Sequence, residues 1–237
     1  MDFYRSDNAI SNDYLYHNIG DSVALYTQDG KVLKQDEVLS YPCVGEDHPG
    51  LRYFRSVRTT GRNESTVVAL FSAKLLNTGT SYMKMWMPAS SDVSYFTALA
   101  PSAKTASSPY QSKPSLVVTM RKEKPAVEEP FVVVYEPISD KLSTGLIESV
   151  DRIKLDSLGK KGCAIKVKTK EGDTFTLVNI LKDGPVILNN QKCCGDFAIF
   201  AKRKGKNSVY VGNGSFVENK EFKVESENRG SFYMEYD

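Results

Sequence analysis

The feature that most limits how this chain can fold is a succession of short runs of β-branched and aromatic residues, broken by turn residues. Runs before residue 138 include "DSVALY", "TVVALFSA", "YMKMWMP", "SLVVTMR" and "FVVVYEP", and later ones include "CAIKVKT", "TFTLVNIL", "FAIFAKR" and "SVYVG". Many alternate between apolar and polar residues, as a strand with one buried side does. Helical periodicity is nearly absent. The pattern predicts an all-β fold of antiparallel strands in stacked sheets, of the β-sandwich or supersandwich type.

The methionine-rich run "YMKMWMP" illustrates the alternation. In a strand, Met83, Met85 and Met87 share one face, while Lys84 and Trp86 lie on the other. We therefore expect one buried face here, with the sole tryptophan packed beside the methionines.

Turn residues separate the runs. Glu171-Gly172-Asp173 lies between two alternating runs, which is a strong hairpin signal. Gly30 in "TQDGK" and Gly214 in "GNGS" predict turns of the same kind. Residues 139–150 form the one stretch with any helical character, and Gly145 interrupts it.

Two irregular stretches divide the chain. Residues 100–114 are rich in Ser, Pro and Ala and predict an exposed loop, and residues 121–130 are charged and flanked by prolines. The strand that follows ends at Pro137. We therefore predict a first stacked-sheet region over residues 1–137 and a smaller C-terminal β-sandwich over residues 138–237.

Charge and hydropathy exclude several classes of partner. The 237 residues include 31 basic and 29 acidic ones, for a formal charge of +2. We expect no nucleic-acid partner from this balance, and no apolar run reaches the length of a membrane span. The N-terminus "MDFYRSDNAIS" lacks the basic start and apolar middle of a signal peptide. A secreted protein should have one, so the chain is expected to be cytosolic or cut from a longer precursor.

The cysteines predict free thiols rather than a metal site. The chain has Cys43, Cys163, Cys193 and Cys194 but no CxxC pair, and it has only two histidines. Neighbouring side chains of one strand diverge, so Cys193 and Cys194 are poorly placed to bridge each other. We expect no metal and no cofactor.

The weak catalytic candidates are Tyr14, Tyr16 and His17, in the stretch "NDYLYHNIGD". A tyrosine and a histidine can exchange protons as general acid and base. On a strand, however, Tyr14 and Tyr16 share one face while His17 lies on the other, so the three do not converge. His48 lies in the polar turn "GEDHPG" and is expected to be solvated. No GxSxG, HExxH or phosphate-binding glycine loop occurs, and the stretch favours a structural strand.

Aromatic residues raise a competing interpretation. With 13 tyrosines and 11 phenylalanines, the chain has rings on which sugars could stack. Tyrosines at alternate strand positions are more often half-buried sheet residues. A carbohydrate-binding module therefore stays an alternative that the aromatic count does not decide.

A further set of stretches occurs in consistent order along the chain: "NDYLYHNIGDSVALY", "SYMKMWMP" followed by "VSYFTALAPS", "KPSLVVTMRKEKPAVEEPFVVVYEPIS", "IESVDRIKL" and "AIKVKTKEGDTFTLV". The third is the most specific, with a "P-x-L-x-V-x-R" strand, a charged link and then "PFV-x-VYEP". Together they resemble the C-terminal β-sheet region of the heparinase II/III-like polysaccharide lyases.

The resemblance implies a definite architecture. These lyases carry an N-terminal α/α toroid followed by stacked antiparallel sheets, and they cleave uronic-acid polysaccharides by β-elimination. Toroid residues do most of the chemistry, so the resemblance implies a non-catalytic sheet region whose partners are a polysaccharide and an upstream toroid. It also implies a periplasmic or secreted location. Some members place a metal-binding His before Asp-Tyr, where this chain has Asn12. His17 matches the "YHN" position, but we do not expect it to be catalytic.

Three readings stay open at this point. The first is the non-catalytic sheet region, the second a self-standing carbohydrate-binding β-sandwich, and the third a small active lyase with its site around Tyr14 and His17. If the first is right, the face around residues 12–21 evolved to be covered. We then expect self-association, or binding of the toroid, through the N-terminal part.

Overall fold

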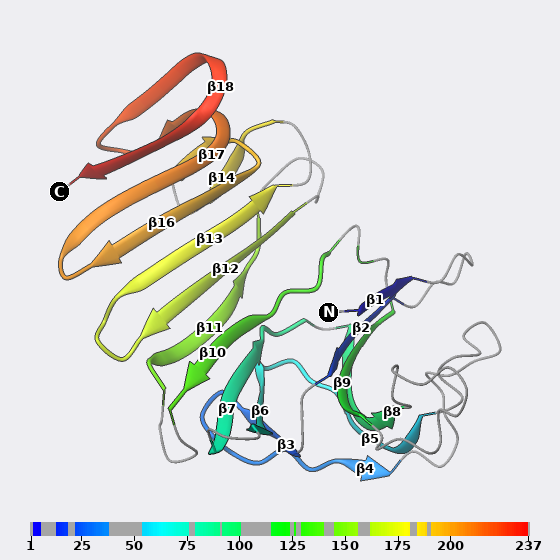
Figure 1. Cartoon of the computed structure of the whole chain (residues 1–237). Coiled ribbons are helices and arrows are strands. Elements are labelled where there is room, and N and C mark those ends of the chain that lie inside the picture. The colour runs from blue at the N-terminus through cyan, green and yellow to red at the C-terminus, as the bar shows by residue number, and fades with distance from the viewer. Residues whose placement is uncertain are drawn as a thin grey trace. The chain divides into compact units, whose positions relative to one another are not determined.

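The structure, a computed structural model, describes residues 2–5, 13–18, 22–37, 54–75, 79–90, 92–100, 115–123, 126, 129–139, 145–155, 162–180, 184–188 and 191–236. All regular elements of these residues are strands, paired antiparallel in three sheets (Figure 1). The expected all-β, antiparallel, sandwich-like fold is confirmed. In the described part of the chain, no helix has the length and hydropathy needed to cross a membrane. Asn12, Cys43 and His48 lie outside the described residues.

Contacts divide the chain into two compact units. The first unit comprises Met1–Ala126 and Val133–Gly145, and the second comprises Val127–Val132 and Leu146–Asp237.

The first unit contains two sheets. The six-stranded sheet has the order β1 (Asp2–Arg5), β2 (Asp13–Asn18), β9 (Ser115–Lys122), β8 (Val93–Ala100), β5 (Arg55–Arg62) and β4 (Asp36–Glu37). The four-stranded sheet has the order β10 (Val134–Ile138), β7 (Gly79–Met87), β6 (Val67–Leu75) and β3 (Ser22–Thr27).

Strand β7 is buried on both faces, and the expectation of a single buried face was wrong here. Met85 and Met87 are 0% exposed, and Trp86 on the opposite face is 3% exposed. The indole N–H of Trp86 donates to the buried carboxylate of Glu136 at 3.0 Å. Glu136 lies on β10, which pairs with β7. The tryptophan therefore packs as expected, but it does so around a polar partner 50 residues away.

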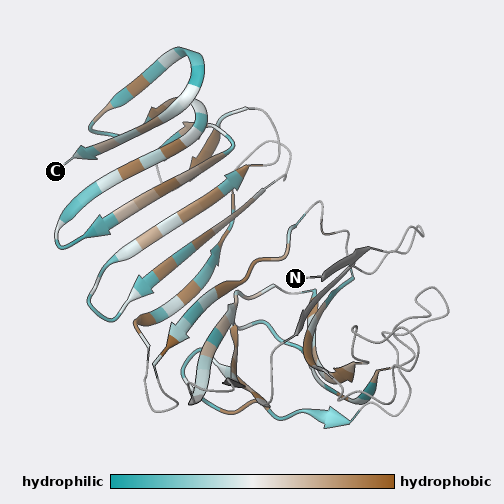
Figure 2. Ribbon diagram, viewed as in Figure 1, coloured by the Kyte–Doolittle hydropathy of each residue, from teal (hydrophilic) through white to brown (hydrophobic). Residues whose placement is uncertain are grey.

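The second unit contains one sheet of eight strands. Its path is β11 (Ile147–Ile153), β12 (Gly162–Thr169), β13 (Thr174–Ile180), β16 (Phe197–Arg203), β17 (Lys206–Glu218), β15 (Gln191–Cys194) and β14 (Val186–Leu188), and β18 (Lys223–Tyr236) also pairs with β17. Figure 2 shows apolar and polar residues mixed along these strands. The core cluster comprises Ala164, Val178, Ile180, Val186, Leu188, Cys193, Ala198, Phe200, Val209, Val211 and Val217.

The hairpin predicted at Gly172 is confirmed. Strands β12 and β13 pair with each other, and the Gly172 N–H donates to the carbonyl of Thr169 at 3.0 Å. Gly172 has a φ of 87°, which a glycine adopts without a steric penalty. Gly30 also lies in a turn, where its N–H donates to the carbonyl of Thr27. The helical stretch is not found in its described part, since β11 begins at Ile147.

The turn expected at Gly214 is wrong, because Gly214 lies inside strand β17. Register shifts occur on both sides of it in the pairing with β18. A Cβ at Gly214 would lie 2.5 Å from the carbonyl oxygen of Cys194, on β15. The glycine is therefore required by a close approach between two strands within the sheet. On its C-terminal side β17 pairs with β15, and on its N-terminal side with β16.

We expect Gly214→Ala to lower the free energy of unfolding by about 1–3 kcal/mol, because the added Cβ meets Cys194 and Val211. The matched control is Gly230→Ala, on the residue paired with Gly214 in β18, where an added Cβ meets nothing within 4 Å. The control should stay within about 0.5 kcal/mol of the wild type. Urea denaturation measures both, and equal effects would contradict the close approach.

Candidate functional site

The three sequence candidates lie on β2, between β1 and β9. The register places Tyr14 opposite Tyr4 on β1 and Arg121 on β9, and it places His17 opposite Val118. The alternation of side chains along a strand predicts opposite faces for Tyr14 and His17. The side chains of β2 lie outside the described residues, and the roles of Tyr14, Tyr16 and His17 stay predictions.

The same sheet carries an internal ion pair. Lys122 at the end of β9 is 0% exposed, and its ammonium lies 3.4 Å from the carboxylate of Asp92. Asp92 also accepts a hydrogen bond of 2.7 Å from the Ser90 hydroxyl. Burial by itself raises the pKa of Asp92, but the Ser90 hydrogen bond and the charge of Lys122 outweigh it, and the pKa lies below its ordinary value. A buried pair of this kind cannot reach a polymer and is a structural element.

Metal ligands do not cluster in the described part of the chain, where no group of three or more His, Cys, Asp or Glu could hold an ion. Cys163, Cys193 and Cys194 are free thiols. Burial raises the pKa of the Cys193 thiol to about 11, so this thiol is protonated and unreactive at neutral pH.

The second unit presents a different kind of surface, on the side of its sheet away from the core cluster. On β13, β16, β17 and β18 this side carries Phe175, Leu177, Phe197, Ile199, Tyr210 and Tyr233, and we call it the open face. Leu177, Ile199, Tyr210 and Tyr233 form one row, because each is paired in register with the next. Tyr233 is 60% exposed and Phe197 is 41% exposed. The water-facing side of an antiparallel sheet is usually polar, so this surface is unusual.

The same side of the sheet is buried at β11 and β12. Val150 and Ile165 are 0% and 6% exposed. Arg152 on β11 donates a hydrogen bond of 3.0 Å to the carbonyl of Pro130 and lies 3.4 Å from Glu129. The segment around Pro130 is thereby held at this part of the sheet, while the strands from β13 to β18 keep their large side chains partly exposed.

The aromatic rings of the open face are held in place by their neighbours. The rings of Phe197 and Tyr210 lie 5.5 Å apart at an angle of 36°. Gly212 leaves the space that the Phe197 ring occupies, since a Cβ there would lie 2.2 Å from the ring. The Tyr233 hydroxyl donates to Glu235 at 2.7 Å, and this hydrogen bond is the main reason that the pKa of Tyr233 is raised.

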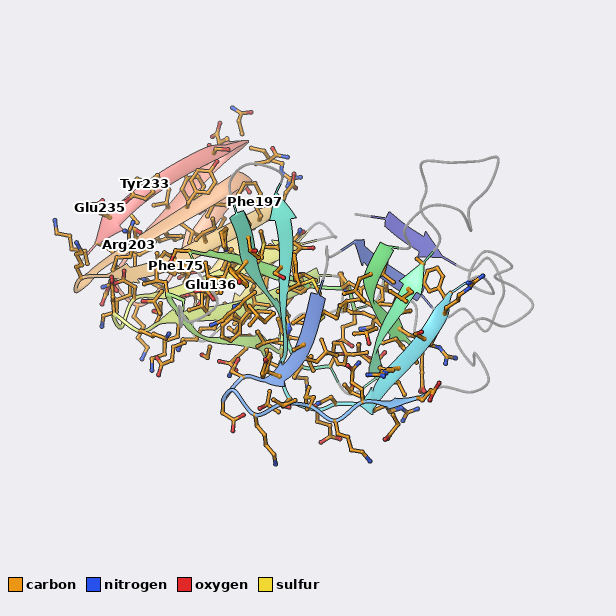
Figure 3. All side chains as sticks on the ribbon, turned by 60° about the horizontal axis from the view of Figure 1, so that its bottom comes forward. Glu136, Phe175, Phe197, Arg203, Tyr233 and Glu235 are labelled. Atoms are coloured by element: carbon orange, nitrogen blue, oxygen red, sulfur yellow. The ribbon has the colours of Figure 1, made fainter. Side chains whose placement is uncertain are left out.

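A basic hairpin borders the open face where β16 turns into β17. Lys202, Arg203, Lys204 and Lys206 are all exposed. Arg203 lies 3.7 Å from the carboxylate of Asp173 and keeps 66% of its side chain exposed. The Asp173 carboxylate also accepts the backbone N–H of Lys204 at 3.0 Å, which fixes the turn. Figure 3 labels Arg203 on β16 and Tyr233 and Glu235 on β18, the two strands that flank β17, together with Phe175 and Phe197.

Sequence reasoning missed the open face because the row is assembled from four strands. The signal in the sequence is that β13 and β16 are apolar on both faces. On β13, Val178 and Ile180 lie on the core side, and Phe175 and Leu177 lie on the other side. On β16, Phe200 lies on the core side and Phe197 on the other. Each of these strands therefore carries apolar residues on both faces. Because a strand of an open sheet needs only one apolar face, the second face indicates a covered or ligand-binding surface.

Comparison with known proteins gives one relation. The chain is similar to the "Endo-acting ulvan lyase" of Formosa agariphila, with 29% identity over 245 aligned residues that cover 98% of this chain. The chain spans 29% of the length of that protein. No family model matches the chain, and no solved structure matches it. The similarity supports a relation to a polysaccharide lyase.

The buried ion pair generates a prediction about pH. We expect Asp92→Asn to lower the free energy of unfolding by about 3 kcal/mol at neutral pH, because the buried Lys122 ammonium then loses the carboxylate that lies 3.4 Å from it. A carboxylate whose folded-state pKa is lowered stabilises the fold above its unfolded pKa of 3.8 and loses this contribution as the pH falls through the folded-state pKa. The difference between wild type and variant should therefore shrink below about pH 4, as measured by denaturant titration at several pH values.

The control for this prediction is the double variant Asp92→Asn with Lys122→Met, which removes both charges. It should be more stable than Asp92→Asn alone. A difference between wild type and Asp92→Asn that does not change with pH would contradict an ionised Asp92.

Proposed function

We propose that this chain is a non-catalytic β-sheet region of a heparinase II/III-like polysaccharide lyase, and that it supports an α/α toroid that cleaves uronic-acid polysaccharides by β-elimination. The observation that carries the proposal is the extent of the similarity, which covers 98% of this chain but 29% of the ulvan lyase. An all-β region of a longer lyase would match that lyase over almost all of its own length but over a minor part of the lyase, as this chain does. The family motifs of residues 12–26 and 113–139 add to it. The location that accompanies the proposal is the periplasm or the outside of the cell.

The chemistry also supports a non-catalytic role. Elimination requires a base within hydrogen-bond reach of the C5 proton and a group that neutralises the uronate carboxylate. Because side chains alternate along a strand, we expect Tyr14 and His17 on opposite faces, and a strand with this alternation would supply only one of them to any single site. The Lys122–Asp92 pair is buried and reaches no substrate.

The second candidate function is a self-standing carbohydrate-binding β-sandwich. The exposed aromatic side chains of the open face favour it, because sugar rings stack on such side chains. The gene sequence upstream of residue 1 separates the two candidates. A reading frame for a helical toroid supports the lyase region, whereas a signal peptide directly before residue 1 supports the module.

We expect the chain by itself not to cleave ulvan, alginate or heparin-like polymers. The measurement is the ultraviolet absorbance of the unsaturated product over a panel of uronides. Turnover that is abolished in His17→Ala but kept in an exposed control variant, Tyr135→Ala, would refute the non-catalytic proposal and favour a small active lyase.

We also propose that the N-terminal part of the chain binds the toroid or, without it, a second copy of the chain. Glutamate substitutions at Tyr14 and Tyr16 should then weaken the association and leave the fold intact. Sedimentation of the chain alone, and of the chain mixed with the upstream domain, measures this. A strictly monomeric chain that does not bind the toroid would contradict the proposal and favour the self-standing module.

A further inference from the structure

We propose that the open face of the second unit binds a stretch of anionic polysaccharide. Its exposed rings would stack on sugar rings, and Arg203 and Lys206 would pair with carboxylate or sulfate groups. The inference rests on the proposed function and adds to it a binding surface in the part of the chain that contains no candidate catalytic residue.

The fold does not require large apolar side chains on this face. The core side of the same strands is already filled, with Val209 and Val211 at 0% exposure and Phe200 at 6%. Tyr233 nevertheless stays 60% exposed on the opposite side. Exposed tyrosine contributes little to folding, because most of its surface stays in water. A ligand is therefore a better reason than packing for its position.

The binding surface is preformed. The Leu177–Ile199–Tyr210–Tyr233 row crosses four paired strands and so extends about 14 Å, which is long enough for a short run of sugar rings. The Phe197 ring contacts the ring of Tyr210 and packs over Gly212, where a side chain would collide with it. Rigid rings lose little conformational entropy when a ligand binds.

Charge indicates which sugars bind. The hairpin of Lys202, Arg203, Lys204 and Lys206 lies beside the row, where β16 turns into β17, and carries four exposed positive charges. Arg203 and Lys206 are paired in register on the side of the open face. Asp173 contacts the Nε atom of Arg203, which orients the guanidinium while leaving most of it exposed. A guanidinium presents further donors in a planar fork that matches carboxylate and sulfate groups. Carboxylate and sulfate are the anionic groups of acidic polysaccharides, so the surface suits an acidic chain better than a neutral one.

The mixture of side chains argues against a permanent protein interface on this face. The cores of such interfaces are depleted in charged residues. Here the Tyr233–Glu235 hydrogen bond places a carboxylate among the apolar residues, and the charged Arg203 lies at their border. Sugar rings carry apolar faces and hydroxyl edges, and the edges can donate to Glu235 or accept from Arg203.

The test is affinity electrophoresis and titration calorimetry of the full chain against three polymers. These are ulvan, which carries sulfate and carboxylate groups, alginate, which carries only carboxylate, and neutral dextran. We expect binding to one or both acidic polymers and none to dextran. Binding of ulvan without binding of alginate would identify sulfate as the recognised group.

Tyr233→Ala should weaken binding by about tenfold. Arg203→Gln should weaken it by about fivefold at low salt and by less at high salt.

Matched controls come from the first unit. Tyr135→Ala removes another exposed tyrosine, and Arg62→Gln removes another exposed arginine that is ion-paired, in this case with Glu123. Both should bind like the wild type, and melting temperatures should show that all four variants fold.

The inference would be overturned if no acidic polymer binds, if dextran binds equally well, or if binding is unchanged in Tyr233→Ala. A dimer that dissociates in Tyr233→Ala would overturn it in favour of an interface between two copies. Cleavage of a polymer by the chain itself would refute the non-catalytic function separately, without bearing on where the polymer binds.

Discussion

The second unit depends on one long strand that contributes to two parts of the same core. Residues of β17 before Gly214 pair with β16, and residues after it pair with β15. Val209 and Val211 from the first part and Val217 from the second belong to one buried cluster. This arrangement requires a glycine at position 214, where the carbonyl of Cys194 leaves no space for a side chain. Because the core is completed on this side of the sheet, the opposite side of β13, β16, β17 and β18 is free to serve another purpose.

Buried charges in the first unit and exposed rings in the second unit are evidence of different kinds. In the first unit, buried charges have nearby partners: Lys122 lies beside Asp92, and Glu136 accepts from Trp86. Buried polar groups with such partners are elements of the fold. In the second unit, Tyr233 and Phe197 are apolar groups that remain in contact with water. Folding alone does not account for them, so they are the stronger indication of a ligand.

Local sequence patterns predicted those features that neighbouring residues determine. The all-β class follows from period-two alternation, and the hairpin at Gly172 follows from its own turn residues. The errors occurred where distant segments decide the outcome. Trp86 on β7 is buried and donates to Glu136 on the neighbouring strand β10, and Gly214 lies within a strand where Cys194 on β15 approaches it. The candidate site shows the same limit. Tyr14, Tyr16 and His17 are adjacent in the sequence, whereas the row that ends at Tyr233 exists only once four strands are in register.

The similarity to the ulvan lyase bears on both units, because an alignment that covers 98% of this chain includes the second one. An accessory sheet that served only to support a catalytic domain would need one face for that contact and a core to remain folded. The second unit has a complete core and, in addition, a row of partly exposed apolar and aromatic side chains beside a basic hairpin. A polymer substrate makes such a surface useful. Weak contacts far from the reacting bond raise the local concentration of polymer at the enzyme, since a chain held at one site is more often presented to another. The proposed support of a catalytic domain and the proposed retention of a polymer are therefore compatible roles for the two units.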